Sequence, residues 1–592
     1  MKKILFLLIF ALVATSSFAS KANSLPAVVS QPDGTMLTVL LQGDENISWY
    51  TTTDGMLLVK RGNGYYVAEV KADGSLAASS LLAHGPAMRG TEETNMMLLQ
   101  NKDKFAKYSS KLLGQPGELP VAEWTNGMTR KMKIRDDSTL FPHMGSPKAL
   151  VILVEFTDTT FSLPDPKASF NDYLNNETGD IVNRGHGENR NAKGVKGYFK
   201  DMSFGQFTPQ FDVVGPVKLS HPLRYYGAGN DYMSRLIPDA CSAVNDSVDF
   251  SQYDSNGDGY VDLVYVIYAG HSASEAGNST DDIWPKSGYA DFGTFDGKKV
   301  YRYGVNNELN GRETSKSKLI NGIGLFCHEF SHTMGLPDIY ATSGAPGYNK
   351  DNFGMEFWDL MDGGEYVHSG RFPTAYTSWE REVMGWMNVD TLSDTAHVVL
   401  KTIDSKGDSA RSFKIVNPSV KNEAVYLQNI QNKGWNYYLP GHGLLVYRVS
   451  YASDDVNFAD NPNNGSRPRI VCIPADGKLG AIADYADDST PDNYYADMAG
   501  DTYPGTSNVS SIASFTMYSG DALDRPILNI KEDGTLVSFD YLGKKIPSAI
   551  NSVMVNDKAT DRIFNLNGML MGTDKTRLPK GIYIINGKKI VL

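Results

Sequence analysis

Cysteine is almost absent from this chain, which has only Cys241, Cys327 and Cys472 among its 592 residues. This scarcity excludes a scaffold held together by disulfides and leaves room for one disulfide at most. We therefore expect another stabiliser, and metal ions are the obvious candidates. Histidine is also scarce, with 10 residues, so histidines that stand close together in the sequence need an explanation.

Positive charge is in deficit, since 56 Lys and Arg stand against 68 Asp and Glu, for a formal net charge of −12. Nucleic-acid binding rests on Lys and Arg that neutralise phosphates, so we expect no nucleic-acid partner. Long apolar runs are also lacking, so we expect no stable membrane span.

The chain begins with a short apolar run, residues 4–14, which follows Lys2 and Lys3 and precedes the small residues Ser17 and Ala19. This pattern is typical of a secretory signal peptide, here residues 1–19, and the alternative is a membrane anchor. We expect a protein that is secreted or held at the cell surface.

What the chain does contain indicates several folded domains, because 41% of its residues are hydrophobic and its length exceeds one ordinary domain. The predicted fold class is multidomain α+β. Residues 23–140 alternate apolar and polar positions between Asp-Gly and Asn-Gly turns, which predicts a small β-rich domain. Residues 145–392 mix continuous apolar strands with helical patterns, which predicts an α/β domain that includes a hairpin-like pair of strands over residues 204–219.

The C-terminal third is richer in strands and loops. Residues 396–543 carry strand patterns between acidic Gly/Asp/Asn loops, which predicts a β-sandwich. Residues 546–592 form a short strand-rich segment with Asn-Gly turns at 567–568 and 586–587, which favour hairpins.

The stretch "HEFSHTMGLPDIY", residues 328–340, carries the strongest chemical signal. On a helix, His328 and His332 lie one turn apart on one face, close enough to bind one Zn²⁺. Glu329 can reach a water at that metal. Gly335 can end the helix and let the chain return Asp338 as a third ligand. The alternative is a buried helix that carries stray histidines.

The same phrase resembles the secreted immune inhibitor A-type zinc metallopeptidases, a metzincin-like family. Other stretches are similar to that family too, among them "PKALVILVEFTD", "VKGYFKDMSFGQF" and "FPTAYTSWEREVMGW", so the resemblance covers about residues 23–540. It implies a zymogen with a prodomain over residues 23–140 and a metzincin-like catalytic domain over residues 145–392. The implied activity is zinc-dependent endopeptidase hydrolysis of proteins or peptides.

The resemblance also implies site residues. His328, His332 and Asp338 would bind zinc, Glu329 would be the catalytic base, and Met361 would be the Met-turn residue. Standard metzincins have histidine where Asp338 stands, so Asp359 and Glu365 remain alternative third ligands. Tyr366, which follows the Met-turn, is a candidate oxyanion stabiliser; an ordinary loop tyrosine is the alternative.

A second metal is predicted at "DSNGDGYVD", residues 254–262. The ligands would be Asp254, Asn256, Asp258, the Tyr260 carbonyl and Asp262, at EF-hand-like spacing for Ca²⁺. Position twelve is Tyr265 instead of a glutamate, so Asp281 or Asp282 would complete the shell. The alternative is a turn rich in Asp, Asn and Gly.

Two further expectations concern export and activation. The tail "LPKGIYIINGKKIVL" and Asn565–Gly568 resemble sorting domains of the type IX secretion system, which implies secretion machinery as a partner for residues 546–592. The alternative is a terminal strand pair of the sandwich. We expect prodomain cleavage near Arg130-Lys131 or after Arg135, in a connector that looks exposed; the alternative is a permanent accessory domain.

Two other functions stay open on the sequence alone. One is a calcium-stabilised extracellular adhesin or binding protein with an inactive protease fold, which the intact Glu329 disfavours. The other is a zinc exopeptidase, because a sequence does not say how a cleft closes.

Overall fold

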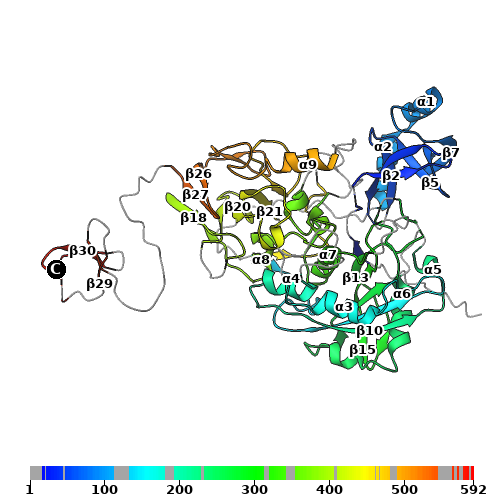
Figure 1. The fold of residues 1–592 in the computed structure, drawn as a ribbon, viewed down its shortest axis with the longest axis horizontal. Coiled ribbons are helices and arrows are strands. Elements are labelled where there is room, and N and C mark those ends of the chain that lie inside the picture. Colours follow the sequence, from blue (N-terminus) through cyan, green and yellow to red (C-terminus); the bar gives the residue numbers. More distant parts are fainter. Residues whose placement is uncertain are drawn as a thin grey trace, which may run out of the picture.

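The computed structural model describes the chain in segments. They are residues 16–19, 22–23, 25–44, 47–112, 132–179, 193–227, 233–275, 277–279, 281–311, 319–341, 354–405, 410–451, 453–460, 462–465, 467–480, 490–543, 563–565, 570–572, 576, 578–585 and 588–591. Helices and strands are mixed throughout, as the predicted multidomain α+β class requires (Figure 1). In this part of the chain no helix is long and apolar enough to cross a membrane.

The N-terminal domain is a six-stranded antiparallel sheet in sequence order, as its turn signals predict. Its strands are β2 (Ala27–Ser30), β3 (Met36–Gly43), β4 (Ser48–Thr52), β5 (Leu57–Arg61), β6 (Gly64–Val70) and β7 (Leu76–Leu82). Two helices follow, α1 (Thr91–Leu99) and α2 (Lys102–Leu112). The Gln100 side chain joins them to the sheet, because its amide donates to the carbonyls of Leu57 and Ala68.

The central sheet has the order β1-β13-β16-β12-β9-β10. Four strands run parallel, β9 (Lys148–Glu155), β10 (Gln210–Lys218), β12 (Val264–Tyr268) and β16 (Arg302–Asn307), whereas β13 (Lys286–Tyr289) is antiparallel to β16. Strand β1 (Ser16–Ala19) pairs with β13 at the edge and lies within the expected signal peptide. Removal of that peptide would leave β13 as the edge strand.

Strand β9 is buried on both faces, which explains its continuous apolar sequence. Val151 and Leu153 face the core beneath α3 (Pro166–Asn175), α4 (Val195–Met202) and α7 (Ile323–Thr333). Leu150 and Ile152 face a second core with α5 (Leu223–Gly227) and α6 (Met233–Val244). Residues 204–219, expected to form a hairpin-like pair, instead give one strand, β10, parallel to β9, because its partner is the neighbouring buried strand.

The connector before β9 differs from the exposed segment that its charges predict. Met132 and Ile134 are buried in the main core, together with Leu140 and Phe141. Strand β8 (Lys133–Ile134) pairs in parallel with β22 (Asp455–Val456). Residues 132–141 therefore pack with the central domain, although their sequence groups them with the N-terminal one.

Two sheets face each other over residues 390–541. One contains β17 (Asp390–Thr391), β19 (Ser412–Val416), β20 (Glu423–Ile430), β21 (Gly443–Ser450) and β23 (Ile470–Cys472), and the other β18 (Ala396–Leu400), β26 (Ile527–Asp533) and β27 (Leu536–Tyr541). Val425 and Leu427 of β20 share a core with Val537 and Phe539 of β27, as in a sandwich. The opposite side of β20 and β21, with Tyr426 and Tyr447, packs into the central domain core. Helix α9 (Thr490–Met498) was not foreseen from the sequence.

Smaller elements complete the fold: β11 (Tyr260–Val261), β14 (Thr294–Phe295), β15 (Lys298–Val300), β24 (Phe515–Thr516), β25 (Ala522–Leu523) and α8 (Ser378–Val383). The last sheet has the order β29-β28-β30-β31, with β28 (Ile563–Asn565), β29 (Leu570–Gly572), β30 (Ile582–Ile585) and β31 (Lys588–Val591). Ile585 pairs with Lys588 across the predicted Asn-Gly turn. All three cysteines are buried and free, so the structure has no disulfide among them.

Candidate metal centre

Helix α7 carries both motif histidines and is buried along its whole length. It lies on the central sheet against β16 and β13, and Phe326 and Phe330 anchor it in the core beside α4. His328 and His332 are one turn apart, so both imidazoles leave the same face of the helix. The apolar contacts on the other face fix the direction of the two imidazoles.

The helix ends at Gly335, whose φ is +111°, a conformation that favours glycine. The Gly335 N–H donates to the His332 carbonyl and the Leu336 N–H donates to the Ser331 carbonyl. A side chain at Gly335 would place its Cβ 2.5 Å from Cγ2 of Ile134. The positive φ and the close approach of Ile134 therefore both favour glycine at this position. The turn that it forms brings Asp338 back to the histidines.

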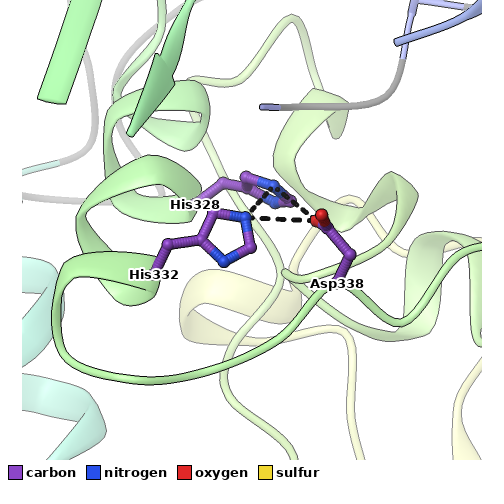
Figure 2. A group of neighbouring side chains, drawn as sticks. All are labelled: His328, His332 and Asp338. Atoms are coloured by element: carbon purple, nitrogen blue, oxygen red, sulfur yellow. Dashed lines mark hydrogen bonds and ion pairs between the residues drawn. The ribbon is translucent and has the colours of Figure 1, made fainter. Parts of the chain in front are cut away.

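Three ligating atoms converge here (Figure 2). Asp338 Oδ1 lies 3.2 Å from His328 Nε2 and 3.2 Å from His332 Nε2, and the two Nε2 atoms are 3.2 Å apart. Zn–ligand bonds of about 2.0–2.1 Å at tetrahedral angles separate ligand atoms by about 3.3 Å. The observed triangle fits one tetrahedral zinc ion and leaves a fourth position open.

The other nitrogen of each imidazole is held by a backbone carbonyl. His328 Nδ1 lies 3.0 Å from the Leu360 oxygen, and His332 Nδ1 lies 2.7 Å from the Leu336 oxygen. A carbonyl only accepts hydrogen bonds, so both Nδ1 atoms are donors and the Nε2 atoms of neutral imidazoles are left as acceptors. Three acceptors that face one another, two nitrogens and a carboxylate oxygen, are stabilised by a shared cation.

The charge state of Asp338 suits this role. Burial acts to raise the pKa of Asp338. When the histidines are protonated, the charge of His332 and hydrogen bonds donated by both Nε2 atoms outweigh burial and lower the pKa to about 2, and a metal cation between the neutral histidines would stabilise the carboxylate in the same way. The side chain is thus an anionic oxygen ligand across the neutral pH range. His328, Glu329, His332 and Asp338 are each no more than 4% exposed.

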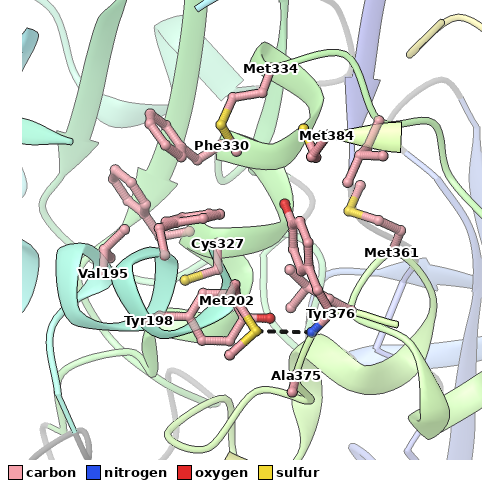
Figure 3. Close-up of a cluster of buried hydrophobic side chains, with 14 of the residues drawn as sticks. Val195, Tyr198, Met202, Cys327, Phe330, Met334, Met361, Ala375, Tyr376 and Met384 are labelled. Carbon is pink, nitrogen blue, oxygen red and sulfur yellow. Dashed lines mark hydrogen bonds between the residues drawn. The ribbon is translucent and has the colours of Figure 1, made fainter. Parts of the chain in front are cut away.

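The predicted Met-turn supports this centre through its backbone. The Leu360 carbonyl accepts from His328, and the Met361 carbonyl accepts from the Ile339 N–H at 2.9 Å, next to Asp338. The Met361 side chain is fully buried in the core with Tyr376 and Met384 (Figure 3). The turn therefore positions one histidine and the return segment together.

The two alternative third ligands lie elsewhere. Asp359 Oδ1 accepts the Met361 N–H at 2.7 Å and lies beside Glu380. Glu365 Oε2 approaches His328 at 3.9 Å but at Nδ1, the nitrogen that faces away from the other ligands. Within the described ranges, His328, His332 and Asp338 are the one group of three potential ligands within 4.8 Å of one another.

Glu329 and Tyr366, the residues predicted to take part in the reaction, lie on α7 and on a turn that contacts it. Glu329 is fully buried on α7, and its charge acts to raise the pKa of both His328 and Glu365. Tyr366 ends a 3₁₀ turn, η3 (Gly363–Tyr366), and lines a cavity of about 410 Å³ beside α7 with Glu365 and Leu325. Its position is compatible with the predicted oxyanion role, which stays a prediction.

The predicted calcium loop is stabilised by its own contacts. Asp254 accepts from the N–H groups of Asp258 and Gly259 and forms an ion pair with Lys298 at 2.6 Å. The Asn256 side chain donates to the Ser138 carbonyl, and Asp258 accepts the Tyr260 N–H. Asp262 accepts the Ser255 N–H at 3.1 Å. Burial raises the pKa of Asp262 to about 6. Among the described residues, no three acidic side chains converge at this loop, Asp281 and Asp282 included, so calcium stays a prediction.

Sequence reasoning missed the backbone partners of the histidines and the close approach of Ile134 to Gly335. Gly324 was missed as well: a Cβ there would lie 2.0 Å from the Glu365 carbonyl, so glycine lets the Met-turn loop contact α7. The second glycine in "GIGLFCHEF", Gly324, was the available signal, because a glycine inside a helix often marks a close approach of another part of the chain.

Comparisons with known proteins find similarity over the part of the chain that contains this site. Residues 142–387 match the family described as immune inhibitor A peptidase M6, catalytic domain. The chain is 26% identical over 289 residues to "Immune inhibitor A" of Bacillus thuringiensis subsp. alesti, which covers 41% of each chain. It is 24% identical over 234 residues to "Pre-pro-metalloprotease PrtV" of Vibrio cholerae serotype O1, which covers 34% of this chain and 25% of the relative.

The matched region thus spans less than half the length of these curated relatives. It includes α7, the return turn and the Met-turn, which form the metal centre. Residues 142–387 are therefore similar to the catalytic domain of the immune inhibitor A peptidases.

Proposed function

We propose that this chain is a secreted zinc-dependent endopeptidase that hydrolyses proteins or peptides and is made as a zymogen. The observation that carries the proposal is the triangle of His328 Nε2, His332 Nε2 and Asp338 Oδ1 at 3.2 Å spacings. A zinc ion held there supplies a Lewis acid that polarises the scissile carbonyl and makes a water acidic near neutral pH.

The chain's own residues do the rest of the chemistry. Glu329, which follows the ligand His328 on α7, takes the proton of the attacking water and gives it to the leaving amine. Leu360 and Leu336 hold the histidines in the tautomer that binds metal. Tyr366 donates to the developing oxyanion from the edge of the cavity.

Latency is supported by the position of the N-terminal segment, because Asn23 and residues 25–27 line the cavity beside α7. Strand β8 further narrows where activation can occur. Its neighbour Arg135 donates its N–H to the Val456 carbonyl, so the bond after Arg135 lies in a paired segment. We place the activating cut before Met132, near Arg130-Lys131, which lie outside the described residues.

Residues 546–592 act in this proposal as the sorting segment for export, and Asp254 to Asp262 as a structural calcium loop. The predicted metzincin-like class rests on the Met-turn, whose backbone holds both His328 and the residue after Asp338. An inactive binding protein is disfavoured, since it has no need of a glutamate at position 329.

The test compares casein hydrolysis and zinc content in the secreted protein, Glu329→Gln and the control Glu177→Gln, which changes a half-buried carboxylate paired with Lys196 and Lys200. We expect one zinc per chain in all three and a loss of hydrolysis of about 10²-fold or more in Glu329→Gln alone. Zinc without hydrolysis in the activated protein would favour the binding-protein alternative, and an absence of zinc would refute the centre.

A further inference from the structure

The cavity beside the metal centre is closed on one side by the chain's own N-terminal segment. Its walls include Leu325 of α7, Glu365 and Tyr366 of the Met-turn loop, Asn307 at the end of β16, and Asn310 after that strand. The remaining side is lined by Asn23 and residues 25–27, which precede or begin the N-terminal sheet. The cavity lies at the carboxyl ends of the parallel strands β12 and β16, where open α/β sheets commonly bind ligands.

The N-terminal segment is held there as a strand is held to a sheet edge. Asn23 forms a parallel bridge with Glu275, and the Asn23 N–H donates to the Ser274 carbonyl at 2.9 Å. The Asn23 side-chain amide donates to Glu275 Oε2 at 3.0 Å. A main-chain bond thus supplies attachment and one side-chain contact supplies selection, which is how proteins bind extended peptides along an edge.

The rest of the N-terminal domain supports this contact. Lys60 Nζ donates to the Gly277 carbonyl at 3.1 Å, and Trp284, which follows the loop, packs into the N-terminal core with Leu37 and Val39. The described residues between Ser272 and Trp284 therefore form a docking surface for the N-terminal domain, which the proposed activation removes.

We infer that Ser272–Glu275 is a peptide-binding edge of the substrate cleft and that Glu275 is a specificity-determining residue. The inference rests on the proposed function and adds the class of substrate. Glu275 selects an extended peptide with a basic side chain at the position where Asn23 now lies. The cavity carries the carboxylates of Glu275 and Glu365, and none of its described lining residues is Lys or Arg. A cationic side chain forms stronger hydrogen bonds to a carboxylate than a neutral amide does.

The first experiment needs no activity and uses the full chain. Hydrogen–deuterium exchange is measured over residues 22–27, where the Asn23 N–H donates to the Ser274 carbonyl, in Asn23→Leu, Glu275→Ala, the double variant, Asn23→Lys and the control Glu177→Gln. We expect exchange about tenfold faster in either single variant, no further gain in the double variant, and slower exchange in Asn23→Lys only while Glu275 is present. Additive effects, or Asn23→Lys as fast as Asn23→Leu, would overturn the inference.

The second experiment reads specificity in the secreted, activated protein with a mixed peptide library. One position of the cleaved peptides should be enriched about tenfold in Lys and Arg, and Glu275→Gln should abolish that enrichment. Cleavage without such a preference would refute the role of Glu275 alone. Absence of all cleavage would instead contradict the proposed function, and the exchange data would still decide on the edge.

Discussion

Replacement of Gly335 by alanine tests how the turn after α7 builds the metal centre. At φ +111° an L-residue costs about 1–2 kcal/mol, and a Cβ placed 2.5 Å from Ile134 Cγ2 overpacks the core by about 1–3 kcal/mol. Gly335→Ala should therefore destabilise the catalytic domain by about 2–5 kcal/mol and weaken zinc binding, because Asp338 depends on this turn.

The conformational cost and the steric cost of Gly335→Ala can be measured separately. Ile134→Ala costs about 2–5 kcal/mol by itself, since Ile134 is buried, but it removes the atom that the new Cβ would meet. In that background, Gly335→Ala should cost only the conformational 1–2 kcal/mol. Gly297→Ala is the matched control, because its φ is +77° and nothing lies within 4 Å of the added Cβ.

Calorimetric unfolding of the four variants and zinc competition with a chelator provide the measurements. An equal cost of Gly335→Ala with and without Ile134, within about 0.5 kcal/mol, would refute the steric argument. A Gly297→Ala variant that loses as much zinc affinity as Gly335→Ala would refute the link between the turn and the ligand. If the activated protein still shows this energetic coupling between Ile134 and Gly335, β8 remains part of the mature enzyme.

Three further predictions concern other parts of the chain. Asp338→Ala should weaken zinc binding about 10²-fold or more, measured by chelator competition, with Glu177→Gln unchanged; an unchanged affinity would make another group the third ligand. Burial raises the pKa of Asp501 to about 8, so folding becomes less favourable as pH rises from about 4 to about 8. Asp501→Asn, which keeps an acceptor for Trp358 Nε1, should remove this pH dependence of the melting temperature, and an unaltered profile would exclude Asp501 as its source. Deletion of residues 546–592 should leave the protein in the periplasm, and normal export of the truncated chain would contradict the sorting role.

Much of the architecture follows from local patterns in the sequence. Period-two alternation and Asp-Gly turns give the N-terminal sheet in its observed order, and the apolar runs give β9 and β12, because a strand buried on both faces has no polar side. The hairpin expected at residues 204–219 failed because local alternation cannot tell a hairpin partner from a distant parallel one, here β9.

For the candidate site too, the sequence specifies some relations between residues and the packing of the fold specifies the others. Spacing on one helix determines that His328, Glu329 and His332 lie together, and a glycine followed by a proline determines that the helix ends before Asp338. Those relations span a few residues, so the sequence carries them without the fold.

Only the tertiary structure favours Asp338 as the third ligand, because Asp338, Asp359 and Glu365 are all carboxylates at plausible separations and only the packed turn brings one of them within 3.2 Å of both Nε2 atoms. It also decided the tautomers through Leu360 and Leu336, the burial of Ile134 against Gly335, and the meeting of Asn23 with Glu275 across 252 residues. Contacts at such separations depend on how sheets and loops pack, and no local pattern in the sequence specifies them.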